Sequence, residues 1–244
     1  MKAVRGGFTL IELMIVIAII AIIAAIAIPG LLQSQRASNE RNASASLKTL
    51  ATGNYDFKTN DRDGNKFGDF WVRDVSGLYT AYPPQTTSLM AIKLIDLSIA
   101  AADTTNVPDQ ATTASSPGTT LITAYLRSGP KAGYWYYAMA SDVSSGTAAV
   151  YGTDTDGNSS RLWHNNSGFG FGAFPDSFGS GRNVFVINEA NTMFKRQTIS
   201  TVRSGSNNPP SDPFPQTGGF VAGSGTAANW PSITSLAADY GKMD

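Results

Sequence analysis

A long apolar block dominates the first part of the chain. From Leu13 to Ile28 every residue is Leu, Met, Ile, Val or Ala, and Pro29 follows directly. Counted from Phe8, this segment predicts about 30 Å of α-helix, the thickness of the hydrocarbon core of a bilayer. We therefore expect residues 8–28 to form a membrane-spanning helix.

After Pro29 the pattern becomes amphipathic. Apolar residues recur at helix-compatible spacings between polar ones, at Leu31, Leu32, Ala37, Ala43, Leu47, Leu50, Ala51 and Phe57. We predict one helix over residues 8–58, bent or loosened at Pro29, whose nitrogen cannot donate a hydrogen bond. Such a helix is about 75 Å long, too long for one domain to bury. Its first half must lie in lipid or among other copies of the chain, and its second half docks a domain.

Residues 59–244 predict a globular domain that is rich in strands. Segments with strand character lie at Leu121–Leu126, Tyr134–Met139, Ala148–Tyr151, Phe169–Phe174, Asn183–Asn188 and Met193–Gln197. The last two segments are expected to form a hairpin. The order of helix and strands predicts an α+β fold, in which the long N-terminal helix packs on an antiparallel sheet.

Other segments of this domain carry weaker signals. A second helix is expected to begin at Thr87 or Ser88, with Leu89, Ile92, Ile95 and Ile99 on one face. Residues 100–120 predict an insertion loop, and residues from 204 onward predict an irregular tail. The run Tyr134-Trp135-Tyr136-Tyr137 should place two aromatic side chains on each face of the sheet. The glycines in 168–172 indicate a strand with close backbone approach.

Charges are sparse around the apolar block. Lys2 and Arg5 precede it, and Glu12 is the only other charged residue before Arg36. The positive-inside rule leaves the N-terminus in the cytoplasm and the bulk of the chain exported. A carboxylate in an apolar span is costly and usually has a partner. Cleavage before Phe8 would create such a partner, a new α-amino group in the same chain or in its neighbour. The alternative is that Glu12 reaches water at the membrane interface.

One segment resembles the class III signal of the type IV pilin superfamily, which includes the pseudopilins of type II secretion: Gly6-Gly7-Phe8-Thr9-Leu10-Ile11-Glu12-Leu13. The resemblance implies that a prepilin peptidase removes residues 1–7 as a leader by cutting between Gly7 and Phe8, and then methylates Phe8. It also implies that Glu12 is needed for subunits to enter a filament. Pro29 matches the proline that the family has within this helix.

The resemblance implies a structural subunit of a type IV pilus-like filament, with residues 8–28 as the filament core. Its partners would be further copies of itself, the prepilin peptidase, the pilus or secretion machinery of the inner membrane, and lipid before assembly. The precursor is expected in the bacterial inner membrane, and the product in an extracellular pilus. One alternative is a pseudopilin in a periplasmic pseudopilus. Another is a membrane-anchored binding domain that never polymerises.

An ordinary secretory signal is a rival interpretation of the apolar block. Ala25-Ile26-Ala27 fits the small-residue pattern of its cleavage site. However, the apolar run is long for such a signal, and Glu12 lies inside it. The amphipathic helix also continues directly past Pro29, which would have no purpose if the segment were removed. We therefore favour the processed anchor.

Composition narrows the function classes. Lys and Arg total 18, and Asp and Glu total 18, so a formal net charge of zero gives no direct nucleic-acid signal. The chain has no cysteine, so an exported domain must be held by its core, and the C-terminal disulfide of many pilins is absent. No combination of residues supports catalysis, and we expect neither an enzyme nor a cofactor.

Two segments place alternating oxygen ligands around a glycine, as calcium loops do, namely Asp61, Asp63 and Asn65, and Asp154, Asp156 and Asn158. Some pseudopilins bind calcium in a loop. Neither segment has an oxygen-bearing side chain at both the first and the last position of an EF-hand loop, so we interpret both as turns and assign no metal. His164 is the only histidine and cannot anchor a zinc site alone. We expect it at the surface.

Overall fold

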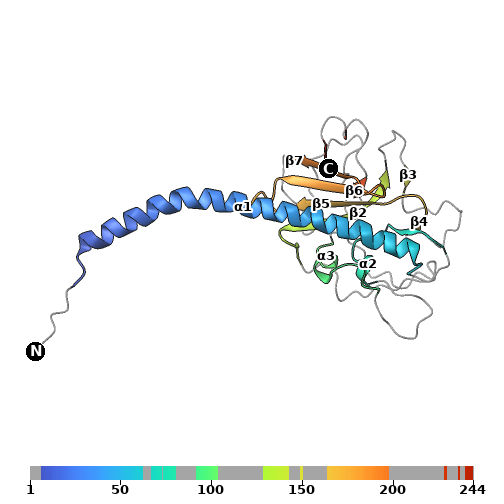
Figure 1. Cartoon of the computed structure of the whole chain (residues 1–244), viewed down its shortest axis with the longest axis horizontal. Coiled ribbons are helices and arrows are strands. Elements are labelled where there is room, and N and C mark those ends of the chain that lie inside the picture. Colours follow the sequence, from blue (N-terminus) through green and yellow to red (C-terminus); the bar gives the residue numbers. More distant parts are fainter. Residues whose placement is uncertain are drawn as a thin grey trace, which may run out of the picture.

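A long helix and one sheet organise the molecule. The computed structural model describes residues 7–62, 67–72, 74–80, 92–103, 129–142, 149–150, 164–197, 228–229, 236 and 240–243. The helix α1 (Leu10–Thr59) packs its second half on the sheet, and its first half projects away from the domain (Figure 1). The helix predicted over residues 8–58 is confirmed, with ends displaced by one or two residues. The α+β fold class is also confirmed.

The main sheet has the strand order β3-β2-β5-β6-β7-β9, and β8 adds a parallel pairing to β2. Its strands are β2 (Tyr134–Asp142), β3 (Ala149–Val150), β5 (Gly170–Pro175), β6 (Asn183–Asn188), β7 (Met193–Gln197), β8 (Ala228–Asn229) and β9 (Gly241–Met243). The predicted hairpin is confirmed as β6 and β7, with the predicted bounds. The prediction at 121–126 lies outside the described residues, as do residues 104–120 of the predicted insertion loop.

Several short strands were not anticipated. A second, two-stranded sheet joins β1 (Phe70–Trp71) to β4 (His164–Asn165). The tail, predicted to be mostly irregular, contains a strand at its end, because β9 pairs with β7 and closes the edge of the main sheet. Two- and three-residue strands carry no alternation of their own. They form because a partner strand offers unpaired backbone groups.

The predicted second helix is wrong over the residues that can be compared. Residues 92–96 are not helical, and the helix here is the single turn α3 (Leu97–Ala100), while 81–91 lie outside the described residues. The backbone of Leu94 instead donates to the carbonyl of Leu78, in the short helix α2 (Gly77–Thr80), at 2.9 Å. This backbone bond to another segment replaces the helical bond that the apolar spacing indicated.

The core lies between α1 and the sheet. The buried apolar residues of α1 are Ala43, Leu47, Leu50, Ala51 and Phe57. Both faces of β2 are covered, and all four aromatic residues of 134–137 are buried. Tyr136 reaches Ser46 on α1, whereas Tyr137 packs against Phe174 and lies near Tyr240. The predicted division of the aromatic side chains between the two faces is confirmed.

The close backbone approach predicted for residues 168–172 is confirmed at Gly172. A Cβ atom at this position would lie 2.2 Å from Cζ of Tyr137. The ring of Tyr137 therefore fills the space above the glycine, in register with the pairing of Tyr137 and Gly172 across β2 and β5. Only glycine allows the two strands to keep this pairing without displacing the ring.

Candidate functional site

The N-terminal end of α1 carries the predicted site residues. Gly7 and Phe8 precede the helix, and the Phe8 side chain is 79% exposed. Thr9 is the N-cap residue, and Glu12 occupies the third helical position. A Thr followed three residues later by Glu is the sequence pattern of a capping box, so the helix begins where this pattern dictates.

The capping box gives Glu12 its partners within the same chain. The backbone nitrogen of Thr9 donates to Oε2 of Glu12 at 2.9 Å, and the Thr9 hydroxyl donates to the same oxygen at 2.6 Å. In return, the Glu12 backbone nitrogen donates to the Thr9 hydroxyl at 3.3 Å. Thr9 was not among the predicted site residues, although the capping-box spacing is the signal that identifies it. The carboxylate is thereby held one helical turn from Phe8.

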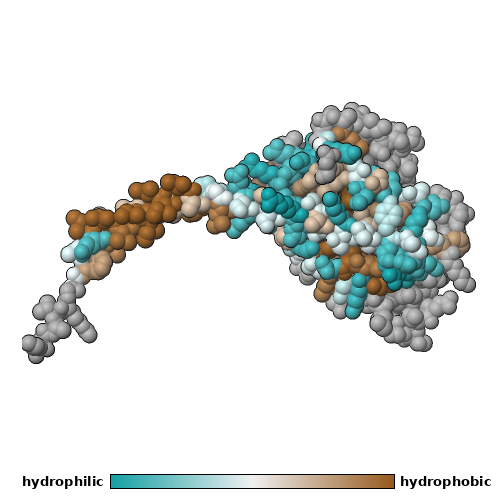
Figure 2. Space-filling view, viewed as in Figure 1, coloured by the Kyte–Doolittle hydropathy of each residue, from teal (hydrophilic) through white to brown (hydrophobic). Residues whose placement is uncertain are grey.

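The apolar half of α1 is bare. Its most apolar 18-residue window has a mean hydropathy of 3.1, and none of that window is buried. Figure 2 shows this half as a continuous hydrophobic rod that ends where the polar domain begins. By length and composition it can cross a membrane. Helix α1 continues through Pro29 without interruption and curves along its exposed part (Figure 1).

Polar side chains attach α1 to the sheet just beyond this rod. Glu40 accepts hydrogen bonds from the backbone nitrogen of Arg182 at 2.9 Å and from Nδ2 of Asn183 at 2.7 Å. The adjacent Asn39 donates from Nδ2 to the carbonyl of Ser180 at 2.9 Å. These bonds fix the helix against the start of β6. The apolar half therefore leaves the domain in one defined direction.

The prediction of a surface position for His164 is wrong. The residue is 1% exposed, and its Nδ1 lies 3.0 Å from Oδ1 of the equally buried Asp69. Its ring packs edge-on against Trp71 and lies 5.8 Å from the ring of Phe57. Burial follows from the pairing of β4 with β1, which places the histidine beneath the end of α1. A two-residue strand gave no sequence signal for that pairing.

The two calcium candidates remain largely untested. Asp61 lies in the turn that follows α1, whereas Asp63, Asn65 and the whole 154–158 segment lie outside the described residues. Within the described residues, no group of three or more His, Cys, Asp or Glu side chains lies together as a metal site would require. The turn predicted after the helix is confirmed for residues 60–62.

Two comparisons with known proteins found matches to parts of the chain. Residues 2–28 match the family described as the prokaryotic N-terminal methylation motif. The type IV major pilin protein PilA of Myxococcus xanthus (strain DK1622) is 47% identical over 64 residues, which are 26% of this chain and 28% of that relative. No solved structure matches the chain. The chain thus carries the N-terminal methylation motif, a class III prepilin signal, and it has an α+β fold.

Proposed function

We propose that this chain is the structural subunit of a type IV pilus-like filament. One observation carries the proposal. A single helix has one half that is fixed to a folded domain and another half that is apolar on every side and entirely bare. Bare apolar surface of this extent is stable only in lipid or against other apolar helices. In the precursor, lipid covers this apolar surface, and in the filament, neighbouring copies of the chain cover it.

Processing follows the motif that the chain shares with its relatives. Residues 1–7 form the leader, a prepilin peptidase cuts between Gly7 and Phe8, and Phe8 is N-methylated. Residues 8–58 then form the helix, with 8–28 in the filament core, and residues 59–244 form the pilin domain. Helix α1 begins at Leu10, so the cleavage point lies in non-helical backbone just before it. The Cβ position of Gly7 has no neighbour within 4 Å, which leaves this bond accessible to a peptidase.

Assembly uses the carboxylate at the start of the helix. Cleavage creates a cationic amine at Phe8, and a carboxylate and an amine in an apolar setting stabilise each other. We propose that Glu12 neutralises the Phe8 amine of a neighbouring subunit as it enters the filament. Before assembly, the carboxylate accepts two hydrogen bonds from Thr9. Assembly therefore exchanges hydrogen bonds within one chain for an ion pair between two chains.

The decisive experiment reads the N-terminus in sheared filaments. Cells producing the protein are sheared, the filaments are pelleted, and the protein in the pellet is analysed by mass spectrometry. An N-methylated Phe8 in that pellet is the expected result. Processed protein confined to the cell envelope would favour the pseudopilin alternative. An intact Met1, or a start at Ile28, would contradict the filament proposal.

A pair of variants tests the role of Glu12. Glu12→Ala should be processed and membrane-bound, but absent from the sheared filaments. Asp56→Ala is the matched control, because it removes a carboxylate from the domain-bound half of the same helix, where Asp56 pairs with Arg62. The control should assemble. Abundant filaments of Glu12→Ala would show that the carboxylate is dispensable.

A further inference from the structure

A groove lies where α1 leaves the domain. Its volume is about 650 Å³, within the roughly 300–1,000 Å³ typical of small-molecule sites. One wall is the helix, with Arg36 and Glu40, and the other is the adjoining ends of β6 and β7, with Arg182, Asn183 and Gln197. The groove is polar, although the rod beside it is apolar.

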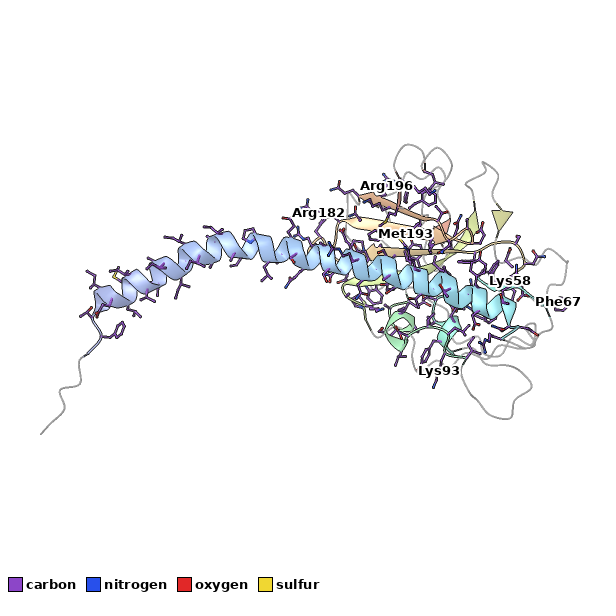
Figure 3. All side chains as sticks on the ribbon, in the orientation of Figure 1. Lys58, Phe67, Lys93, Arg182, Met193 and Arg196 are labelled. Atoms are coloured by element: carbon purple, nitrogen blue, oxygen red, sulfur yellow. The ribbon has the colours of Figure 1, made fainter. Side chains whose placement is uncertain are left out.

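Two arginines give the groove an excess of positive charge. Arg36 comes from α1, and Arg182 comes from the loop before β6, at the end of the domain from which the helix projects (Figure 3). Glu40 is the single carboxylate among the lining residues, and two donors of the domain already bind it. One positive charge is therefore left over. An anion in the groove would balance it.

Donors of both arginines are unused within the described part of the chain. The Nε atom of Arg36 is shielded from solvent, yet it has no hydrogen-bond partner within the described part of the chain. The guanidinium of Arg182 is exposed and makes no hydrogen bond or ion pair with the described residues. Guanidinium groups bind phosphate oxygens through paired hydrogen bonds. A phosphodiester is therefore the ligand chemistry that suits both side chains.

The position of the groove along the helix identifies the source of the phosphate. Leu32 is the last exposed apolar residue before Arg36 and lies four residues from it, about 6 Å along the helix axis. Ile28 lies eight residues from Arg36, about 12 Å along the axis. The polar layer of a bilayer extends about 5–8 Å beyond the hydrocarbon core, and arginine side chains reach toward it. With the apolar rod in the membrane, the groove lies at the headgroups.

We propose that the groove binds the headgroup phosphate of an anionic phospholipid while the subunit waits in the membrane. An anionic lipid is preferred because a zwitterionic headgroup would bring its own cation against the two arginines. The bound lipid would hold the domain at one depth and one rotation beside the bilayer. The inference rests on the proposed membrane-anchored precursor and adds a specific ligand to it.

The test uses the full chain and native mass spectrometry. The protein in detergent micelles is mixed with phosphatidylglycerol or phosphatidylcholine of identical acyl chains, and the retained lipid is measured. A basic side chain at an anionic surface contributes a factor of about five in affinity. Phosphatidylglycerol should thus be retained several-fold better, and Arg36→Gln and Arg182→Gln should each lower its retention about fivefold. Arg41→Gln, exposed on the same helix outside the groove, should leave it unchanged.

Four results would overturn the proposal. Equal retention of the two lipids would remove the headgroup preference, and wild-type retention in the Arg36→Gln/Arg182→Gln double variant would place the lipid elsewhere. Displacement by an equal concentration of soluble glycerophosphoglycerol would show a site for free phosphodiesters. Loss of filaments in the double variant with unchanged lipid retention would assign the groove to a second copy of the chain.

A separate readout keeps the two proposals apart. The wild-type chain is mixed with phosphatidylcholine vesicles and floated on a density gradient. Failure to float would contradict the proposal of a membrane-anchored precursor itself. Flotation, together with equal retention of the two lipids in the mass spectrometry experiment, would contradict the headgroup site alone. The filament proposal would then stand.

Discussion

The side chain of Asn54 makes two hydrogen bonds with the backbone of Trp71. Its Nδ2 donates to the Trp71 carbonyl at 2.9 Å, and its Oδ1 accepts from the Trp71 nitrogen at 2.9 Å. Asn54 is fully buried on α1, and Trp71 lies in β1. A helix side chain thereby takes the place of a neighbouring strand, because its amide offers the same donor and acceptor as a backbone unit.

Replacing Asn54 should destabilise the domain strongly. In Asn54→Leu the branched shape of the side chain is retained, but two buried backbone groups lose their partners, at about 1–3 kcal/mol each. We expect a loss of about 2–6 kcal/mol, measured by urea unfolding of the full chain in detergent with tryptophan fluorescence. Thr52→Ala, at an exposed position of the same helix, should change stability by less than about 0.5 kcal/mol. Equal midpoints for both variants would refute the pairing role.

Gly172→Ala should destabilise the sheet by overpacking. The added methyl group would lie 2.2 Å from the buried ring of Tyr137, which must then shift. Overpacking of this kind costs about 1–3 kcal/mol. Gly179→Ala is the matched control, since its nearest neighbour would lie 3.5 Å away. Melting temperatures followed by circular dichroism should fall for the first variant only, and a wild-type value for both would argue against the close approach.

Stability should fall at alkaline pH through the buried tyrosines. Burial raises the pKa of Tyr136 to about 12 from its usual 10, although a hydrogen bond with Ser46 opposes the shift. A raised pKa favours the neutral form in the folded state. Keeping Tyr136 neutral therefore contributes about 2–3 kcal/mol to the free energy of unfolding below pH 10. This contribution is lost as the pH rises from about 10 to 12. Burial raises the pKa of Tyr137 in the same direction.

Tyr136→Phe should make this alkaline decline shallower. At neutral pH the variant also loses the polar contact of this hydroxyl with Ser46. Melting temperatures between pH 8 and 12 would then show a lower starting value and a smaller fall than the wild type. A fall as steep as that of the wild type would mean that Tyr136 does not contribute to the pH dependence.

His164→Ala should destabilise the junction between β1, β4 and α1. The change removes one hydrogen-bond partner of the buried Asp69 carboxylate, together with the ring that packs on Trp71. Losing a hydrogen bond to a buried charged group costs about 1.5–3 kcal/mol. His164→Asn offers an amide near the position of Nδ1 and should recover part of the loss in urea unfolding. If His164→Ala unfolds at the wild-type midpoint, the pair is not structural.

Features that depend on local sequence were predictable. The uninterrupted apolar run and the helical spacing from Leu31 to Phe57 predicted α1 because both signals repeat over many turns. The β6–β7 hairpin was predictable because its two strands are neighbours in sequence and its short turn sets the register. The motif around Gly7, Phe8 and Glu12 was likewise local.

Features that depend on distant pairing were not predictable. His164 is buried because β4 pairs with β1, more than ninety residues earlier in the chain. Asn54 was assigned no role, since a polar residue on an apolar helix face has no local signal for a partner. The same holds for β9, whose three residues become a strand only against the edge of β7. In each case tertiary contacts outweigh the local pattern.

The continuity of α1 through Pro29 couples the orientation of the domain to that of the rod. An α-helix turns by about 100° and rises by about 1.5 Å with each residue. The direction in which Glu12 points from the helix axis therefore also determines on which side of that axis the sheet lies. Asn39 and Glu40 then prevent the sheet from turning about the helix axis. Any regular packing of the rods therefore imposes a regular pattern on the outer surface. Insertion of one residue between Ile28 and Asn39 would rotate that pattern by about 100° without changing a single rod contact.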